Sequence, residues 1–297
     1  LAKYGLSYDD LKNEFPRLIF CSITGFGQTG PYASRPGYDG LIQAMGGVMA
    51  LTGEPNGEPM TVGVPIGDLM AGMFASVGVL AAVRHQTETG KGQFIDIGML
   101  DTHVAWLANQ GMNYLSTDEN PERLGNQHPN IVPYQVMPTS DGYIVLSIGN
   151  DPTFERFCEL AGETKLLEDD RFKTNASRVS NREHVTKVLN EVTKRKTSNE
   201  WLSELEKAKI GCGPINNLSD VFNDPHVISR KMVMEMEHSK TGEKPLKLIS
   251  NPIKMNETPV SYRYAPPLLG EHTNEILKTE LNLNEDQIKS LKDKNII

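Results

Sequence analysis

Cysteine is scarce in this sequence, and its spacing excludes two kinds of stabilised fold. The 297 residues include three cysteines, Cys21, Cys158 and Cys212, which lie far apart and form no CxxC pair. A disulfide framework normally uses an even, closely spaced set, and a thiolate zinc site uses paired cysteines. We therefore expect neither of these, and we expect a reducing compartment.

Two further features are missing, an excess of positive charge and a long apolar run. The 30 Lys and Arg residues against 38 Asp and Glu give a net charge of −8, and no basic cluster offsets it, which disfavours binding to nucleic acid. The longest apolar stretch, around residues 69–83, contains many Gly and Ala residues and falls short of the roughly 18 residues that cross a membrane. We expect a soluble protein with no membrane partner.

The composition itself is that of an ordinary globular protein. Apolar residues make up 38% of the chain and 26 glycines add to them, which argues against disorder as the main state. A chain of 297 residues is at the upper limit for one hydrophobic core. We therefore expect one large domain or two unequal ones.

The first part of the chain predicts an α/β arrangement. The order is strand, helix, helix, strand, helix, with connections long enough for parallel crossovers. Apolar spacing predicts a short helix near residues 7–14, strands at 17–24 and 93–98, and helices at 38–51, from Gly67 to about Arg84, and at 99–115. A charged turn at 85–92 is expected to end the long helix.

The second part predicts a smaller α+β domain after a polar linker. The linker covers residues 116–130. Beyond it the pattern predicts strands at 142–148, 231–237 and 246–250, helices at about 152–162, 180–196 and 198–208, a loop at 211–217, and two short helices after residue 266. No internal repeat is visible.

A glycine-rich loop follows the first strand. Gly25, Gly27 and Gly30 match the GxGxxG spacing of dinucleotide-binding folds, but Pro31 and residues 35–37 interrupt the helix that this fingerprint needs. A nucleotide site of that type is disfavoured, and a plain turn or another ligand loop remains open, with Arg35 able to supply charge for a phosphate. Serine-hydrolase and zinc-protease motifs are missing and the seven histidines are dispersed, so we expect no metal.

An aspartate remains as the chemical candidate. Asp101 follows the strand at 93–98 and begins the next helix, where the helix dipole favours a carboxylate that can act as a nucleophile. A first-turn acid or helix cap is the commoner role for such an Asp, and the local sequence leaves both interpretations open. Asp96 and Asp68 are interpreted as structural, His103 as helix surface and Trp106 as core.

Several blocks together resemble the class III CoA-transferases, the family that includes formyl-CoA and carnitine CoA-transferases. The blocks are ITGFGQTGPYASRPGYD (23–39), GVPIGDLMAG (63–72), TGKGQFIDIGMLD (89–101), VPYQVMPTSDGYI (132–144), GCGPINN (211–217) and APPLLGEHTNEIL (265–277). They follow one another in order over nearly the whole chain. The segments VPYQ, GPINN and VMEMEH are most similar to those of the branch that exchanges CoA between succinate and glutarate.

The resemblance implies an architecture and a set of site residues. It implies a Rossmann-like large domain (1–116), a linker with an active-site loop (117–135), a small α+β domain (136–250), a returning C-terminal part (251–297), and an interlocked homodimer. Asp101 would be the nucleophile. CoA would be held by Gln28, Thr29, Gly30, Arg35, Gly67, Asp68, Leu69 and Met70, with the acyl-CoA as substrate and no permanently bound cofactor.

Two departures from the family pattern affect the expected site. Family members carry about a hundred further residues at the front, so we expect the large domain to be partial and the natural beginning, with any targeting segment, to lie upstream of Leu1. The glycine-run lid of some members is replaced here by residues 125–129. Arg123, Gly125, Asn126 and His128 are the candidates for the lid and for binding an acceptor carboxylate.

The implied reaction passes CoA from succinyl-CoA to a dicarboxylate such as glutarate, through aspartyl anhydride and aspartyl-CoA thioester intermediates. An acyl-CoA racemase of the same fold is the first alternative, and an inactive truncated homologue that acts only as a partner is the second. The expected location is the mitochondrial matrix in a eukaryote and the cytoplasm otherwise.

Overall fold

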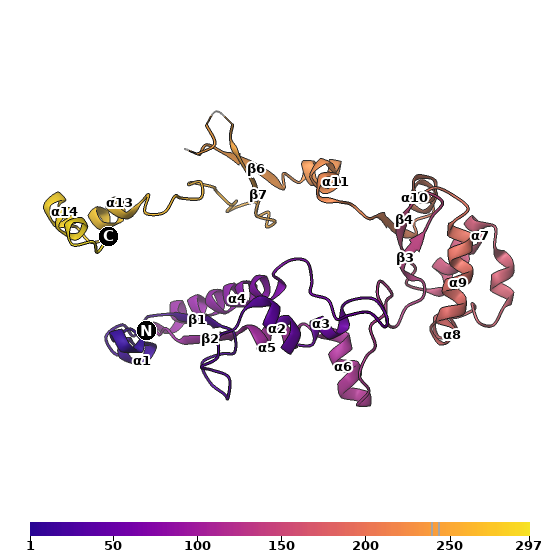
Figure 1. Cartoon of the computed structure of the whole chain (residues 1–297), viewed down its shortest axis with the longest axis horizontal. Helices are drawn as coiled ribbons and strands as arrows, with labels where there is room; N and C mark the ends of the chain where they lie inside the picture. Colours follow the sequence, from indigo (N-terminus) through magenta and orange to yellow (C-terminus); the bar gives the residue numbers. More distant parts are fainter. Residues whose placement is uncertain (239, 243) are drawn as a thin grey trace. The chain divides into compact units, whose positions relative to one another are not determined.

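The computed structural model describes residues 1–238, 240–242 and 244–297 (Figure 1). The chain divides into two units, Leu1–Pro214 and Ile215–Ile297, which are described separately. The predicted domain boundaries, 1–116, 117–135, 136–250 and 251–297, stay a prediction, and the third of these ranges includes the two residues outside the described set.

The first unit opens with a pair of parallel strands. Strand β1 (Phe20–Thr24) pairs in parallel with β2 (Phe94–Gly98), with Phe20 opposite Phe94 and Thr24 opposite Gly98. Parallel pairing needs a crossover, and the chain between the strands forms the helices that supply it. These and the neighbouring helices are η1 (Ala2–Tyr4), α1 (Tyr8–Leu11), α2 (Asp39–Met45), α3 (Val48–Leu51), α4 (Ile66–Thr89), α5 (Met99–Ala105) and α6 (Ala108–Thr117). The predicted α/β order is therefore confirmed.

Three predicted helices have different limits in the structure. The segment at 38–51 splits because Gly47 adopts φ 86°, a left-handed conformation that ends α2 and begins α3. The segment at 99–115 splits at Trp106 and Leu107, where Ala108 has φ 47°. Helix α4 continues through the charged residues to Thr89 and ends at Gly90, whose left-handed conformation forms the C-cap. Glycine geometry sets the limits at Gly47 and Gly90, and the positive φ of Ala108 accompanies the split at residues 106–107.

Helix α4 also corrects the expectation about apolar runs. At 24 residues it is long and apolar enough to cross a membrane by length and composition, although buried core helices of soluble proteins meet the same test. Its buried side is made of small residues, Gly67, Ala71, Ala75 and Ala82. Met73, Val77 and Leu80 are exposed, so in this chain one side of the helix packs and the other presents apolar side chains.

The rest of the first unit is a three-stranded antiparallel sheet covered by helices. Strand β4 (Tyr143–Ser147) lies between β3 (Tyr134–Pro138) and β5 (Gly211–Pro214). The helices are α7 (Asp151–Ala161), η2 (Thr164–Glu168), α8 (Asn175–Ser180), α9 (Arg182–Thr193) and α10 (Ser198–Lys207). Strand β3 was not predicted, and residues 211–214 were predicted as a loop. Both strands are short, and pairing with β4 defines them.

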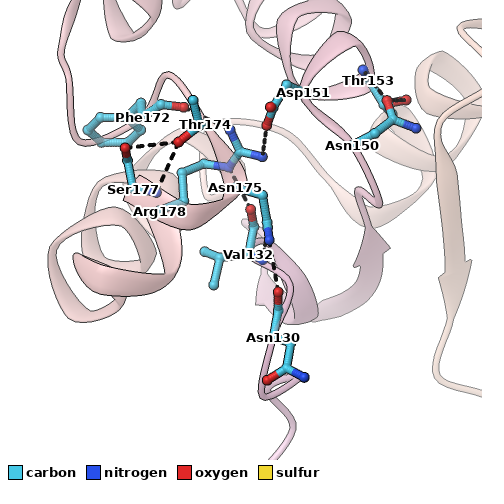
Figure 2. Close-up of polar contacts among 10 residues, drawn as sticks. All are labelled: Asn130, Val132, Asn150, Asp151, Thr153, Phe172, Thr174, Asn175, Ser177 and Arg178. Atoms are coloured by element: carbon cyan, nitrogen blue, oxygen red, sulfur yellow. Dashed lines mark hydrogen bonds and ion pairs between the residues drawn. The ribbon is translucent and has the colours of Figure 1, made fainter.

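A buried arginine ties this sheet to its helices (Figure 2). The guanidinium of Arg178 is fully buried and donates to the carbonyls of Val132 at 2.7 Å and Phe172 at 2.8 Å. Its third bond, at 2.9 Å, goes to the carboxylate of Asp151, which neutralises the charge. The plane also lies over the ring of Phe154, 4.3 Å from its centroid. Three of the five Arg178 N–H donors therefore have acceptors, and its charge has an anionic partner.

A neighbouring asparagine fixes the end of the polar segment that precedes β3. Asn175 donates from Nδ2 to the carbonyl of Asn130 at 2.8 Å, and its Oδ1 accepts from the amide of Val132 at 3.1 Å (Figure 2). Residues 130–132 are thus held by α8, and the polar segment ends at a rigid point.

The second unit consists of short helices and one two-stranded sheet. It contains α11 (Leu218–Asn223), α12 (Pro225–Ser229), the antiparallel strands β6 (Val233–Met236) and β7 (Leu246–Ile249), and the terminal helices α13 (Thr273–Thr279) and α14 (Glu285–Asp293). The two predicted strands and the two final helices are confirmed, the strands being shorter than predicted.

Candidate active site

Asp101 lies in the first turn of α5, directly after β2, and its side chain is exposed. Gly98 forms the junction between the strand and the helix. A Cβ atom added to Gly98 would lie 2.9 Å from Oδ2 of Asp101 and 3.0 Å from the amide nitrogen of Gly27. Only glycine therefore lets the carboxylate and the glycine-rich loop approach the same point.

Hydrogen bonds hold the glycine-rich loop against this turn. The amide of Leu100 donates to the carbonyl of Gly25 at 3.0 Å. The amide of Gln28 donates to Oδ2 of Asp96 at 2.8 Å, and its side chain donates to the hydroxyl of Ser22 at 2.8 Å. The structure thus brings the predicted CoA-binding loop next to the turn that carries Asp101.

The loop continues without helix through Thr29 and Gly30 to Tyr38, and α2 begins at Asp39. A dinucleotide loop would lead directly into a helix, so the geometry agrees with the argument against such a site. Arg35 lies within the loop, with its guanidinium 4.5 Å from the ring centroid of Tyr32 and 5.4 Å from that of Phe26. These rings hold the cation at the surface.

The other predicted CoA-binding residues form the first turn of α4. The amide of Gly67 donates to Oδ1 of Asp39 at 2.7 Å, which caps the helix from outside. Asp68 and Leu69 are exposed, and Met70 is half-buried and lines a cavity of about 340 Å³. Within the part of the chain that the structure describes, no hydrogen bond or ion pair joins this turn to Asp101.

His103 and Trp106 differ from their predicted positions. His103 is 2% exposed, whereas it was expected on the helix surface, and Trp106 is 47% exposed, whereas it was expected in the core. The His103 side chain fits because Gly46 and Gly67 lack side chains. A Cβ atom added to Gly67 would lie 2.8 Å from Cε1 of the ring, and one added to Gly46 would lie 2.6 Å from Cβ of His103. Burial lowers the pKa of His103, and the charge of Asp39 and the Met99 carbonyl oppose that shift.

Within the described residues, neither ring nitrogen of His103 has a hydrogen-bond partner. The ring lines the same 340 Å³ cavity as Met70 and Trp106. His103 and Asp101 are two residues apart on one helix and therefore point to opposite sides of it. The cavity is for this reason separate from the predicted nucleophile.

The predicted lid residues lie in the polar segment between α6 and β3. The amide of Gly125 donates to the carbonyl of Gly53 at 3.2 Å. His128 stacks on Tyr134 with ring centroids 5.2 Å apart, and its Nδ1 accepts from the amide of Asn130 at 3.1 Å. Asn126 is exposed. His128 is thus engaged within the segment itself.

Arg123, the predicted cation, donates to three backbone carbonyls within residues 50–57, which include the end of α3 and the loop that follows it. The bonds run from Nη2 to Gly57 at 2.5 Å, from Nη1 to Ala50 at 3.3 Å and from Nε to Glu54 at 3.4 Å. A second arginine was missed by the sequence analysis. Arg182 donates to Oε1 of Gln127 at 3.4 Å and to the carbonyl of Pro129 at 2.6 Å. Nothing in the local sequence near Arg182 indicates these distant partners.

Among the described residues, no group of three or more His, Cys, Asp or Glu side chains is placed to hold a metal ion.

Comparison with known proteins gives consistent matches. The model of the family described as CoA-transferase family III matches residues 1–273. A succinate–glutarate CoA-transferase of Agrobacterium fabrum is 43% identical over 277 residues, 93% of this chain and 69% of that protein. The succinyl-CoA:glutarate CoA-transferase of Homo sapiens is 38% identical over 291 residues, 98% of this chain and 66% of that protein.

A crystal structure of a CAIB/BAIF family protein from Brucella suis is similar in both fold and sequence. It matches with a TM-score of 0.79 and 43% identity, over 95% of this chain and 72% of that one. Judged by the two CoA-transferases above, this chain spans about two thirds of the length of its relatives. With a family match over residues 1–273 and these similarities, the chain belongs to CoA-transferase family III.

Proposed function

We propose that this chain transfers CoA from succinyl-CoA to glutarate or a similar dicarboxylate, with Asp101 as the nucleophile. The names of two relatives, at 43% and 38% identity, support these substrates. The observation that carries the proposal is the junction at Gly98, where the absence of a side chain leaves room for both the Asp101 carboxylate and the Gly27 amide.

The reaction needs no oxidant and no external proton. A carboxylate oxygen of Asp101 attacks the thioester carbon of succinyl-CoA, the C–S bond breaks, and a succinyl-aspartyl anhydride and the CoA thiolate result. The thiolate attacks the carbonyl carbon of Asp101, the bond to succinate breaks, and an aspartyl-CoA thioester remains. Glutarate then attacks the carbonyl carbon of this thioester, the C–S bond breaks, and a glutaryl-aspartyl anhydride and the CoA thiolate result. The thiolate attacks the glutaryl carbon, the bond to the Asp101 oxygen breaks, and glutaryl-CoA leaves with the carboxylate restored.

Two groups of residues would hold CoA during these steps. Gln28, Thr29, Gly30 and Arg35 belong to the loop that is hydrogen-bonded to the Asp101 turn. Gly67, Asp68, Leu69 and Met70 supply the N-terminus of α4, where the helix dipole favours an anionic group. Arg35, kept at the surface by two rings, is the cation for a phosphate.

The polar segment would provide the lid and bind the acceptor. Gly125, Asn126 and His128 are proposed to cover the reacting groups, because an anhydride exposed to water would hydrolyse and the enzyme would become a thioesterase. Arg123 is proposed to bind the far carboxylate of the dicarboxylate.

We also propose an interlocked homodimer, with the mitochondrial matrix as the location in a eukaryote and the cytoplasm otherwise. The exposed apolar side of α4, with Met73, Val77 and Leu80, supports the dimer, since an apolar stripe of this size normally packs against another element.

The test replaces one oxygen of the proposed nucleophile. Asp101→Asn keeps the shape of the side chain and removes its charge, so CoA transfer should fall by roughly a thousandfold or more while CoA affinity changes little. Asp118→Asn, an equally exposed Asp at the C-cap of α6, is the matched control and should keep full activity.

Transfer measured with radiolabelled succinyl-CoA and glutarate decides between the functions. Near-normal transfer by Asp101→Asn would end the proposal. Deuterium exchange at the acyl α-carbon, without movement of CoA between acids, would favour the racemase alternative. Wild-type protein that neither transfers CoA nor exchanges deuterium would favour the partner role.

A further inference from the structure

Two arginines from distant parts of the first unit line one cavity. Arg123 comes from the polar segment and Arg182 from the first turn of α9, and both line a cavity of about 480 Å³. Ala50, Pro55 and Gln127 also line this cavity. Both arginine side chains are half-buried. The cavity lies within a single unit of the chain.

Each guanidinium keeps free donors after its protein contacts. A guanidinium has five N–H groups in a planar fork. Arg123 uses three of them on carbonyl oxygens, and Arg182 uses two, on Gln127 and Pro129. The contacts fix both side chains, and the remaining donors stay available for another acceptor.

Neither charge is neutralised by an ion pair. Across the residues that the structure describes, no carboxylate pairs with Arg123 or Arg182, whereas the buried Arg178 pairs with Asp151. Glu122 and Glu183 also line the cavity but are exposed. Burial without an anionic partner lowers the pKa of Arg182. Each guanidinium can therefore form a charge-assisted hydrogen bond with an anion that reaches the cavity.

We infer that Arg123 and Arg182 together form a binding site for one anionic group, a carboxylate or a phosphate. The planar guanidinium groups can donate paired N–H bonds to two oxygens of either a carboxylate or a phosphate. This inference rests on the proposed function, which supplies two candidate sources, the far carboxylate of the dicarboxylate acceptor and the 3′-phosphate of CoA. It adds Arg182 to the acceptor residues and makes the pair, not Arg123 alone, the element that selects a charged substrate.

Titration calorimetry on the full chain tests the site without requiring turnover. Glutarate is compared with pentanoate, which lacks the second carboxylate, and CoA with dephospho-CoA. The wild-type protein should bind glutarate more tightly than pentanoate, or CoA more tightly than dephospho-CoA. Arg182→Gln should weaken binding of that ligand by roughly tenfold to a hundredfold and leave the analogue unchanged.

Three further variants separate binding from structure. Arg182→Lys keeps the charge and should retain part of the preference, and Arg123→Gln should reduce the same preference as Arg182→Gln. Arg171→Gln removes an exposed arginine that pairs with Asp169 and should change nothing. The thermal midpoint of each variant shows whether it folds.

The outcome identifies the source of the anion. A lost glutarate preference assigns the far carboxylate, and a lost CoA preference assigns the phosphate. The site is overturned if the wild-type protein shows no preference. It is also overturned if folded Arg182→Gln keeps an unchanged preference. If that variant does not fold, an unchanged preference in both Arg182→Lys and Arg123→Gln overturns the site. Full transfer by Asp101→Asn would instead overturn the proposed function and leave the binding result standing.

Discussion

The regions at residues 1–117 and 132–214 are built in different ways. The second encloses a continuous core that includes Phe154, Phe157, Trp201 and Leu205, all essentially inaccessible. In the first, the corresponding cluster consists of Phe26, Ile42, Ala71 and Met99, and much of α4 remains exposed. Stability is thus concentrated in one region.

The chemical candidates lie in the other region. Asp101, Gln28 and Arg35 all belong to residues 1–117 and are exposed. A side chain that is already in water contributes little to folding, so it can be exchanged without loss of structure. We therefore expect substitutions of these exposed side chains to change activity, and substitutions in the buried core of the second region to change stability.

The strongest test of this separation is Arg178→Met. Removing the buried cation leaves the carbonyls of Val132 and Phe172 without donors and Asp151 without a partner. The free energy of unfolding of the second region should fall by about 3–5 kcal/mol. Hydrogen exchange should speed up in β3 and β4 and stay unchanged in β1 and β2.

The control for that substitution is Arg171→Met, which breaks an exposed pair with Asp169 and should cost less than about 1 kcal/mol. Equal acceleration of exchange in all strands would show that the two regions unfold together, and the comparison would fail.

Alkaline pH tests the core of the second region. Burial raises the pKa of Cys158 from 9.0 to about 12. Between these values the unfolded chain releases the thiol proton and the folded chain keeps it, so stability is lost as pH rises. The loss should reach about 2–3 kcal/mol at pH 11, measured by urea unfolding. Cys158→Ala should reduce the slope of the free energy of unfolding against pH, whereas Cys21→Ala should retain that slope.

Acidic pH tests the first region through His103. Because burial lowers its pKa, the folded chain resists protonation, and stability should fall as pH drops below about 6.5. The slope for one such group cannot exceed about 1.4 kcal/mol per pH unit. His103→Gln should reduce it in urea-unfolding series, whereas His85→Gln, at an exposed position, should not. Identical slopes would mean that His103 is accessible to protons in the fold.

The smallest effect is expected at the start of α10. Thr197 accepts from the amide of Glu200, and Glu200 accepts from the amide of Thr197 at 2.8 Å, which forms a capping box. Thr197→Ala should lower the free energy of unfolding by about 1 kcal/mol. A thermal melt checks this value, and CoA transfer should not change.

The sequence predicted what depends on neighbours along the chain. The Asp101 turn follows a strand of alternating apolar residues and starts a helix with an apolar face. The residues on either side of the turn were therefore enough to predict both elements. Strand β5 contains two glycines and a proline and has no strand pattern of its own, since pairing with β4 creates it. For the same reason β3, which begins next to Pro133, was missed.

The remaining differences arise from contacts between distant residues. His103 is buried because Gly46 and Gly67 leave room for its ring, and both lie far from it in sequence. Arg182 meets Gln127 and Pro129, which lie 55 and 53 residues away in the sequence. Residue type and spacing therefore predicted the strand–helix turn that carries Asp101 but not the side chains that depend on tertiary packing. The role of Asp101 as the nucleophile comes from the family resemblance and stays a proposal.

The most direct test of the central claim is chemical trapping of Asp101. During turnover with succinyl-CoA and glutarate, hydroxylamine should convert the activated carboxylate into a hydroxamate that peptide mass spectrometry locates at Asp101. An active enzyme recovered with Asp101 unmodified, or with the hydroxamate on another residue, would contradict the account.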